Sequence, residues 1–317
     1  MKRSVNGLWL IVVVTTILQI IRPIVNIPFL TVIIVLLPTI FALVHGAMRY
    51  RWRGILIFLA VCLVVSNIFE NMSILTGFPF GNYYYTDVLG AKLFLVPLLI
   101  GPAYFSTGYL AWVLATVIVG DVGRKSSWFM TVAVPVIASF LMVAWDLCFD
   151  PTVSTVRQTW IWKQGGGYFG VPLSNYLGWY LVVYVFLQIF AVYLRYRRAE
   201  NNETAPELAS SYYVQAIILY GAIAAGFLVS YAVSGQSDSL VTDAVGIVWH
   251  TASISEAMAI ISIFTMLFGG VLATVKLVQV MSLNTVEQGV SQASHSRETA
   301  ERRSSQQPQI AVSERHG

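Results

Sequence analysis

The chain has 317 residues, of which 57% are hydrophobic and 11% are charged, whereas roughly a quarter of the residues of a soluble domain are charged. Together with a mean hydropathy of +0.71, this composition excludes an ordinary soluble domain and predicts a polytopic membrane protein. The formal net charge is only +4, with the basic residues at segment ends rather than in one patch, so we expect no nucleic acid partner.

Eight apolar segments, each long enough or nearly long enough to cross a bilayer, follow one another along the chain. Backbone polar groups inside lipid must be satisfied within their own segment, so we expect each segment to be a helix. The segments cover residues 8–21, 28–46, 54–75, 95–119, 128–149, 176–196, 212–233 and 250–275. The sequence therefore predicts an all-α membrane bundle of about eight transmembrane helices.

The composition changes near the carboxyl end of the chain. From about Ser282 the residues are mainly Ser, Gln, Glu and Arg, which are too polar to bury a core. We therefore expect a transmembrane domain over residues 1–280 and a disordered cytoplasmic tail over residues 281–317.

Lys and Arg residues are distributed unevenly between the two sets of connections. If the amino terminus is cytoplasmic, the inner connections hold Lys2, Arg3, Arg49, Arg51, Arg53, Arg124, Lys125, Arg195, Arg197 and Arg198. The outer connections hold Arg22, Lys92, Arg157 and Lys163. By the positive-inside rule, we expect both termini to lie in the cytoplasm and the chain to lie in the cell membrane.

Two carboxylates, Asp146 and Asp150, stand near the end of the fifth apolar segment. Their four-residue spacing puts both on one face of a helix, provided that the helix reaches Asp150. Two carboxyls held close together cannot both ionise cheaply, so one can serve as an acid while the other serves as a base. Asp150 precedes Pro151, however, and this leaves open a role as a helix cap or turn residue.

A third acid, Glu70, ends the third apolar segment, with Ser66 and Asn67 on the same predicted helical face. An acid with hydrogen-bonding neighbours in an apolar surround is a candidate proton donor, although a polar clamp between helices remains an alternative. In the predicted topology Glu70, Asp146 and Asp150 share the outer side with Asn175. We therefore expect them to form one acid site for a hydrophobic substrate.

The loop between the fifth and sixth segments is rich in aromatic residues and glycine. The loop contains Trp160, Trp162, Tyr168 and Phe169, and Trp179 lies near the start of the sixth segment. Such residues are typical of an interfacial anchoring belt, but they also suit the lining of a site for a flat apolar ligand, where aromatic faces can stabilise a cation.

Several motifs are absent from the sequence. It has no DDxxD-like carboxylate motif, no P-loop and no His or Cys cluster with metal-ligand spacing. We therefore predict neither a metal nor a nucleotide cofactor.

Three groups of residues carry a resemblance to a known family: Glu70 with segment 76–85, Trp145 and Asp146 with Asp150 and Pro151, and segment 160–179. Over roughly residues 45–275 the chain resembles the carotenoid biosynthesis membrane proteins typified by the CruF carotenoid hydratases. The resemblance implies a cofactor-independent hydratase, a hydro-lyase, that adds water to the terminal C=C of an acyclic carotenoid end group. It implies a hydrophobic polyene or isoprenoid substrate, contact with membrane lipid, and other enzymes of the pathway as partners.

This reaction suits the acids described above. A protonated carboxyl would deliver a proton to the alkene, and a carboxylate would deprotonate the water that captures the resulting tertiary cation. We expect Glu70 or Asp146 to be the acid and Asp150 to be the base or charge stabiliser. Asn175 with Tyr84 would position the water. The residues expected to contact the substrate are Asn67, Phe80, Tyr84, Trp145, Trp160, Tyr168, Asn175 and Trp179.

Two other functions start from the same residues. A proton-initiated terpenoid or carotenoid cyclase or isomerase would form the same cation but end the reaction without water. A non-enzymatic carotenoid- or lipid-binding membrane protein would use the acids for gating or packing.

Overall fold

A computed structural model of the chain describes residues 2–25, 29–197, 208–234 and 237–283. The chain divides into two compact units, Met1–Thr274 and Val275–Gly317. The first unit contains every element discussed below. In the second unit only the last residues of the final helix, up to Leu283, are described. The tail that the sequence predicts over residues 281–317 lies almost wholly outside the described residues.

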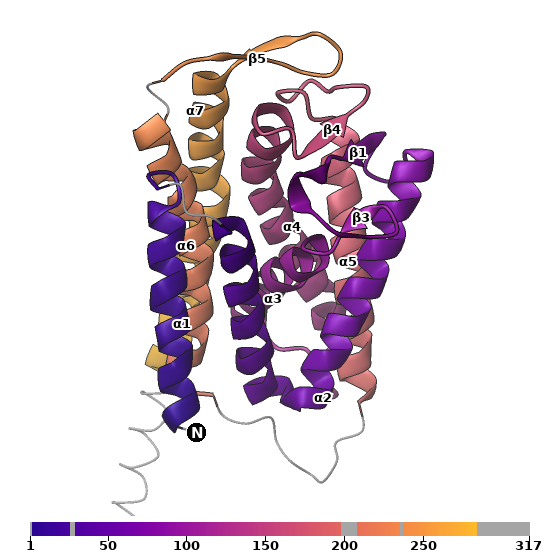
Figure 1. The fold of residues 1–317 in the computed structure, drawn as a ribbon. Coiled ribbons are helices and arrows are strands. Elements are labelled where there is room, and N and C mark those ends of the chain that lie inside the picture. Colours follow the sequence, from indigo (N-terminus) through magenta and orange to yellow (C-terminus); the bar gives the residue numbers. More distant parts are fainter. Residues whose placement is uncertain (1, 26–28, 198–207, 235–236, 284–317) are drawn as a thin grey trace, which may run out of the picture. The chain divides into compact units, whose positions relative to one another are not determined.

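Helices make up most of the described chain (Figure 1). They are α1 (Lys2–Ile21), α2 (Leu30–Thr76), α3 (Ile100–Val119), α4 (Trp128–Asp150), α5 (Leu173–Tyr196), α6 (Ser210–Ser234) and α7 (Thr251–Ile261), and α7 begins an apolar helix that ends at Leu283. Six helices of the described chain are long and apolar enough to cross a membrane, and α1 includes a shorter apolar helix, Asn6–Ile21. The prediction of an all-α membrane bundle is confirmed.

Helix α2 consists of two helices that meet at a sharp bend. Arg51, with φ 58° and ψ 167°, breaks the helical backbone, and the chain reverses there, so that both halves extend from the bend toward the same end of the bundle (Figure 1). The halves contain residues 30–46 and 54–75 of two predicted segments, so the eight predicted segments correspond to eight helical segments. A Cβ on Gly46 would lie 2.4 Å from Cδ1 of Ile55, so glycine at position 46 lets the two halves pack closely.

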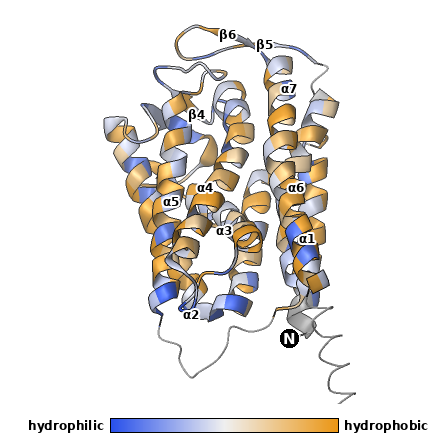
Figure 2. Ribbon diagram, turned by 180° about the vertical axis from the view of Figure 1, so that it is seen from behind, coloured by the Kyte–Doolittle hydropathy of each residue, from blue (hydrophilic) through white to orange (hydrophobic). Residues whose placement is uncertain are grey.

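Helix α3 lies at the centre of the first unit, where it packs against α2, α4, α5 and α6. All its side chains from Tyr104 to Thr116 are buried. Around it, α4 packs along α5, and α1 packs along α6 and α2. Apolar residues cover the outer faces of these helices (Figure 2), as expected for surfaces that face lipid.

Short strands, which the sequence analysis did not predict, join the loops at one end of the helices. They are β1 (Tyr83–Tyr85), β2 (Lys92–Leu93), β3 (Val96–Pro97), β4 (Trp160–Trp162), β5 (Leu240–Thr242) and β6 (Val248–His250). Each is paired antiparallel, as β1 with β4, β2 with β3, and β5 with β6. The β1–β4 pair matters most for the site, because it ties the loop after α2 to the loop after α4.

Basic residues gather at the other end of the helices. Arg49, next to the bend of α2, forms an ion pair with Asp121 after α3. Arg195 donates to the backbone oxygen of Ser126 at 2.7 Å, and Arg197 donates to that of Tyr50 at 3.1 Å. These arginines belong to the set that the positive-inside rule assigns to the cytoplasm.

Candidate active site

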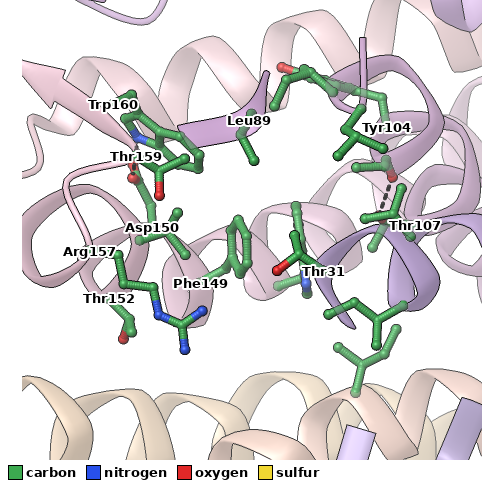
Figure 3. A pocket seen from close by; sticks show the side chains of 18 of the residues that line it. Thr31, Leu89, Tyr104, Thr107, Phe149, Asp150, Thr152, Arg157, Thr159 and Trp160 are labelled. Carbon is green, nitrogen blue, oxygen red and sulfur yellow. Dashed lines mark hydrogen bonds between the residues drawn. The ribbon is translucent and has the colours of Figure 1, made fainter. Parts of the chain in front are cut away.

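A cavity of about 260 Å³ lies at the strand end of the helices, and its wall includes Glu70, Asp150 and Asn175. Figure 3 shows part of this wall, with Asp150 beside Trp160. Aromatic side chains form much of the remaining wall. They are Phe80, Tyr83, Tyr85, Tyr104, Trp145, Phe149, Trp160, Trp162, Trp179 and Phe227. The structure thus brings acids from α2 and α4 together with an amide from α5 around one aromatic chamber.

Glu70 is 3% exposed and accepts hydrogen bonds from three phenols. The Tyr83 and Tyr85 hydroxyls donate to Oε2, the latter at 3.0 Å, and the Tyr104 hydroxyl donates to Oε1 at 2.8 Å. Burial raises the pKa of Tyr83 and Tyr85 well above the usual tyrosine value, and the adjacent Glu70 carboxyl raises it further. Both phenols therefore stay protonated near neutral pH and can keep donating to the carboxyl.

The neighbours expected for Glu70 have other partners. The Ser66 hydroxyl donates to the backbone oxygen of Leu63 at 3.4 Å, and the Asn67 side-chain oxygen accepts from the Asn71 amide at 3.1 Å. The prediction that Ser66 and Asn67 support the carboxyl is therefore wrong. Sharing a helical face was not enough, because the loop after α2 folds back and brings its tyrosines to Glu70.

Asp146 and Asp150 do lie on one face of a helix. The backbone of Asp150 is helical, with φ −61° and ψ −47°, and the helix continues into a π-helical turn, η2 (Pro151–Val156). The Ser154 hydroxyl donates to the Asp150 backbone oxygen at 2.9 Å, which holds this turn against the helix end. Asp150 therefore belongs to the helix, and the alternative of a cap or turn residue is wrong.

The Asn175 amide joins the two carboxylates. Its Nδ2 donates to Oδ2 of Asp146 at 2.9 Å and to Oδ2 of Asp150 at 2.8 Å. The indole Nε1 of Trp160 donates to the other oxygen of Asp150 at 2.7 Å. Asp146 and Asp150 are each 1% exposed, but only Asp150 belongs to the cavity wall. Asp150 can therefore touch a bound molecule, whereas Asp146 contacts Asn175 of the cavity wall.

The β1–β4 pair sets the two acid groups opposite each other. In its register Tyr85 pairs with Trp160, and the centroids of their rings are 5.7 Å apart. Tyr85 donates to Glu70 and Trp160 donates to Asp150. One strand pair therefore fixes a hydrogen-bond donor for each carboxyl.

Stacked aromatic rings form the wall between the acids. The ring of Trp179 is parallel to that of Tyr104, with centroids 4.2 Å apart and an interplanar angle of 4°. Its edge meets Trp145 at 5.8 Å, and Trp145 in turn stacks on Phe149 at 4.6 Å. Such a surface suits a flat apolar ligand, and its ring faces can stabilise a cation.

The remaining expected contact residues divide into two groups. The first group lines the cavity and consists of Phe80, Trp145, Trp160, Asn175 and Trp179. The second group lies outside the described part of the cavity wall and consists of Asn67, Tyr84 and Tyr168.

The last two side chains are held elsewhere. Tyr84 is 45% exposed, and its ring lies 5.9 Å from the Lys163 amine. The Tyr168 hydroxyl donates to the backbone oxygen of Leu147 at 3.2 Å. The structure thus gives no support for Tyr84 as the residue that positions water.

The sequence does not by itself identify Tyr83, Tyr85 and Tyr104 as hydrogen-bond donors to Glu70. A signal was present, because alternate residues of a strand share one face, and Tyr83 and Tyr85 flank Tyr84 in a run of three tyrosines. Tyr104 stands inside an apolar segment, and no local pattern relates it to Glu70.

Comparison with known proteins shows the family of the chain. A model of the carotenoid biosynthesis protein family matches residues 30–236, a range that contains α2 through α6 and every site residue described above. No curated protein and no solved structure matches the chain. The family match covers more than half of the chain and confirms the resemblance found in the sequence. The chain belongs to the carotenoid biosynthesis protein family.

Proposed function

We propose that this integral membrane protein of carotenoid biosynthesis adds water to the terminal C=C of an acyclic carotenoid end group. One observation carries the proposal: Glu70 and Asp150, each with its own set of hydrogen-bond donors, line the same aromatic cavity. Addition of water needs an acid and a base on a single alkene, and the two carboxyls supply both.

Glu70 is the acid in this proposal. It gives a proton to the less substituted carbon of the alkene, and the alkene's π electrons form the new C–H bond. A tertiary cation remains on the neighbouring carbon. The three phenols around Glu70 are fixed before the reaction, so they stabilise the carboxylate that is left behind.

Asp150 is the base. A water oxygen bonds to the cation while the water gives a proton to Asp150, so the product has gained one complete water molecule. Asn175 and Trp160 hold the Asp150 carboxylate toward the cavity. The proton then returns from Asp150 to Glu70 before the next cycle, and neither residue is consumed.

The aromatic wall protects the cation and selects the substrate. Trp179, Tyr104 and Trp145 present ring faces and edges to the chamber, where a cation can be stabilised without being captured by a protein nucleophile. Apolar side chains of α3, among them Ile100 and Leu110, also line the cavity and suit the remainder of a polyene.

The orientation of the protein follows from its charges. With the arginine-rich end of the helices in the cytoplasm, both termini lie inside and the cavity lies toward the outer face of the cell membrane. A substrate dissolved in the bilayer would then enter from the lipid rather than from water.

Expression of the chain in a lycopene-accumulating host tests the reaction. We expect pigments whose mass has increased by one or two waters, depending on whether one or both ends react. Products of unchanged mass would instead indicate cyclisation or isomerisation. Binding of the polyene without any product would indicate a carrier and would overturn the proposal.

A further inference from the structure

Two arginines line the same cavity as the acids but take no part in the reaction proposed above. Arg22 follows directly after α1, and Arg157 follows directly after the turn η2. Both belong to the cavity wall. The guanidinium of Arg157 extends into the open space beside Phe149 and Thr152 (Figure 3).

Neither guanidinium has an acidic partner among the described residues. The ion pairs between described residues join Arg49 with Asp121, Lys92 with Asp87, and His250 with Asp238. Burial, together with the nearby charge of Arg157, lowers the pKa of Arg22 to about 10. Two positively charged guanidinium groups repel each other, and burial removes part of the water that would stabilise them. Their charged forms are therefore unfavourable there unless an anion binds between them.

The position of the arginines indicates where the anion comes from. Arg157 follows the last residue of a membrane-spanning helix, Trp128–Val156, and Arg22 follows the last residue of the apolar helix Asn6–Ile21. Both therefore stand at the level where a helix leaves the hydrocarbon and lipid headgroups begin.

The wall next to the arginines is apolar. It includes Ile34 and Pro38 of α2, and Ile223 and Phe227 of α6. A ligand that satisfies the whole region needs an anionic group for the guanidinium groups and a hydrocarbon chain for this wall. Free phosphate supplies only the first of these.

We propose that Arg22 and Arg157 bind the phosphate of an anionic membrane phospholipid, with one of its acyl chains along the apolar wall of the cavity. Guanidinium groups match phosphate oxygens with two parallel hydrogen bonds, which makes arginine well suited to this contact. The inference goes beyond the proposed hydration, because it requires neither proton transfer nor turnover.

The purified full-length chain in detergent micelles allows a direct test by thermal unfolding and by lipid titration. We expect phosphatidylglycerol to bind and stabilise the wild-type protein more than phosphatidylcholine does. Arg22→Gln and Arg157→Gln should each lower the affinity for phosphatidylglycerol roughly ten-fold or more, as loss of a charge-assisted hydrogen bond implies. Inorganic phosphate should give little stabilisation.

A matched control removes the same charge elsewhere. Arg124 and Lys125 are exposed in the connection between α3 and α4, at the opposite end of the helices. The single variants Arg124→Gln and Lys125→Gln should each keep the wild-type response to phosphatidylglycerol.

The behaviour without lipid separates binding from a structural role. Because the two arginines repel each other, Arg22→Gln should unfold at the wild-type temperature or higher in lipid-free micelles, while losing the gain from phosphatidylglycerol. A lower unfolding temperature without lipid together with a full lipid response would overturn the proposal. So would equal stabilisation by inorganic phosphate. These readouts measure binding, so failure here leaves the hydration proposal untouched, and absence of hydration leaves the lipid site untouched.

Discussion

Tyr85 and Trp160 face each other across the β1–β4 pair, and each donates a hydrogen bond to a different buried carboxyl. Tyr85 donates to Glu70 at 3.0 Å, and Trp160 donates to Asp150 at 2.7 Å. The loops after α2 and α4 therefore cannot shift independently without breaking one of these contacts. Two short strands thus determine the relative position of the acid and base that we propose.

Replacement of Glu70 by Gln should abolish hydration. The amide keeps the shape of the carboxyl, and its single oxygen can still accept from the phenols on one side, but it cannot deliver the proton, so we expect turnover to fall by roughly 10²–10⁴-fold. Product formation per amount of membrane protein measures this. Glu256→Gln is the matched control, since Glu256 is exposed on α7, and this variant should keep full activity.

Replacement of Trp160 by Phe should impair the site by removing one hydrogen bond. Asp150 would lose its donor to Oδ1 while most of the aromatic ring stays in place. Loss of a hydrogen bond to a buried polar group costs roughly 1–3 kcal/mol, so both turnover and unfolding temperature should fall.

Trp162→Phe provides the comparison for that variant. Trp162 is the second buried tryptophan of β4, and its Nε1 lies near the Asp150 carboxyl but makes no hydrogen bond of normal geometry to a described residue. Its replacement by Phe breaks no such bond and should have the smaller effect. An equal effect of the two substitutions would show that the Trp160–Asp150 hydrogen bond is unimportant.

The acids could be found from the sequence because ionisable residues at the ends of apolar segments are unusual. Glu70, Asp146, Asp150 and Asn175 were therefore recognised, and so was the helical bundle. The pairing of β1 with β4 is not predictable from the sequence, because strands of three residues are too short to show a clear periodic pattern. Strand alternation places Tyr83 and Tyr85 on one face and Tyr84 on the other, but without the register of β1 and β4 the sequence does not show which face meets Glu70.

The bend in α2 shows a similar limit. The cluster of Arg49, Arg51 and Arg53 predicted a connection between two spans, and this is where the chain reverses direction. The structure makes the reversal at Arg51 alone, whereas the sequence indicated a connection of several residues. A conformation with positive φ at a non-glycine residue has no local sequence signature.

The two aspartates should differ in importance. Asp150 lines the cavity and Asp146 does not, so Asp150→Asn should abolish turnover while Asp146→Asn should retain a measurable fraction of it. Turnover of both variants in the same membranes measures the difference. Complete loss in Asp146→Asn with normal activity in Asp150→Asn would show that the roles are reversed.

Gly178 keeps α5 close to the loop after α2. A Cβ at this position would lie 2.7 Å from Cδ1 of Phe80 and 2.9 Å from the backbone oxygen of Pro79. We therefore expect Gly178→Ala to destabilise the protein by roughly 1–3 kcal/mol through overpacking, and to lower turnover by displacing Phe80. Thermal unfolding and product formation check both effects.

Gly221→Ala is the control for this substitution. In α6 a Cβ on Gly221 would meet no atom within 4 Å, so alanine should stabilise the helix by about 0.5–1 kcal/mol. Equal behaviour of the two alanine variants would contradict the close approach at Gly178.

Turnover of an acyclic carotenoid in water labelled with ¹⁸O tests the central claim most directly. Membranes containing the wild-type chain should give a product that carries one ¹⁸O atom for each modified end, and membranes containing the Glu70→Gln variant should give none. A product without ¹⁸O, or a labelled product formed equally well by the Glu70→Gln variant, would contradict hydration by the Glu70 and Asp150 pair.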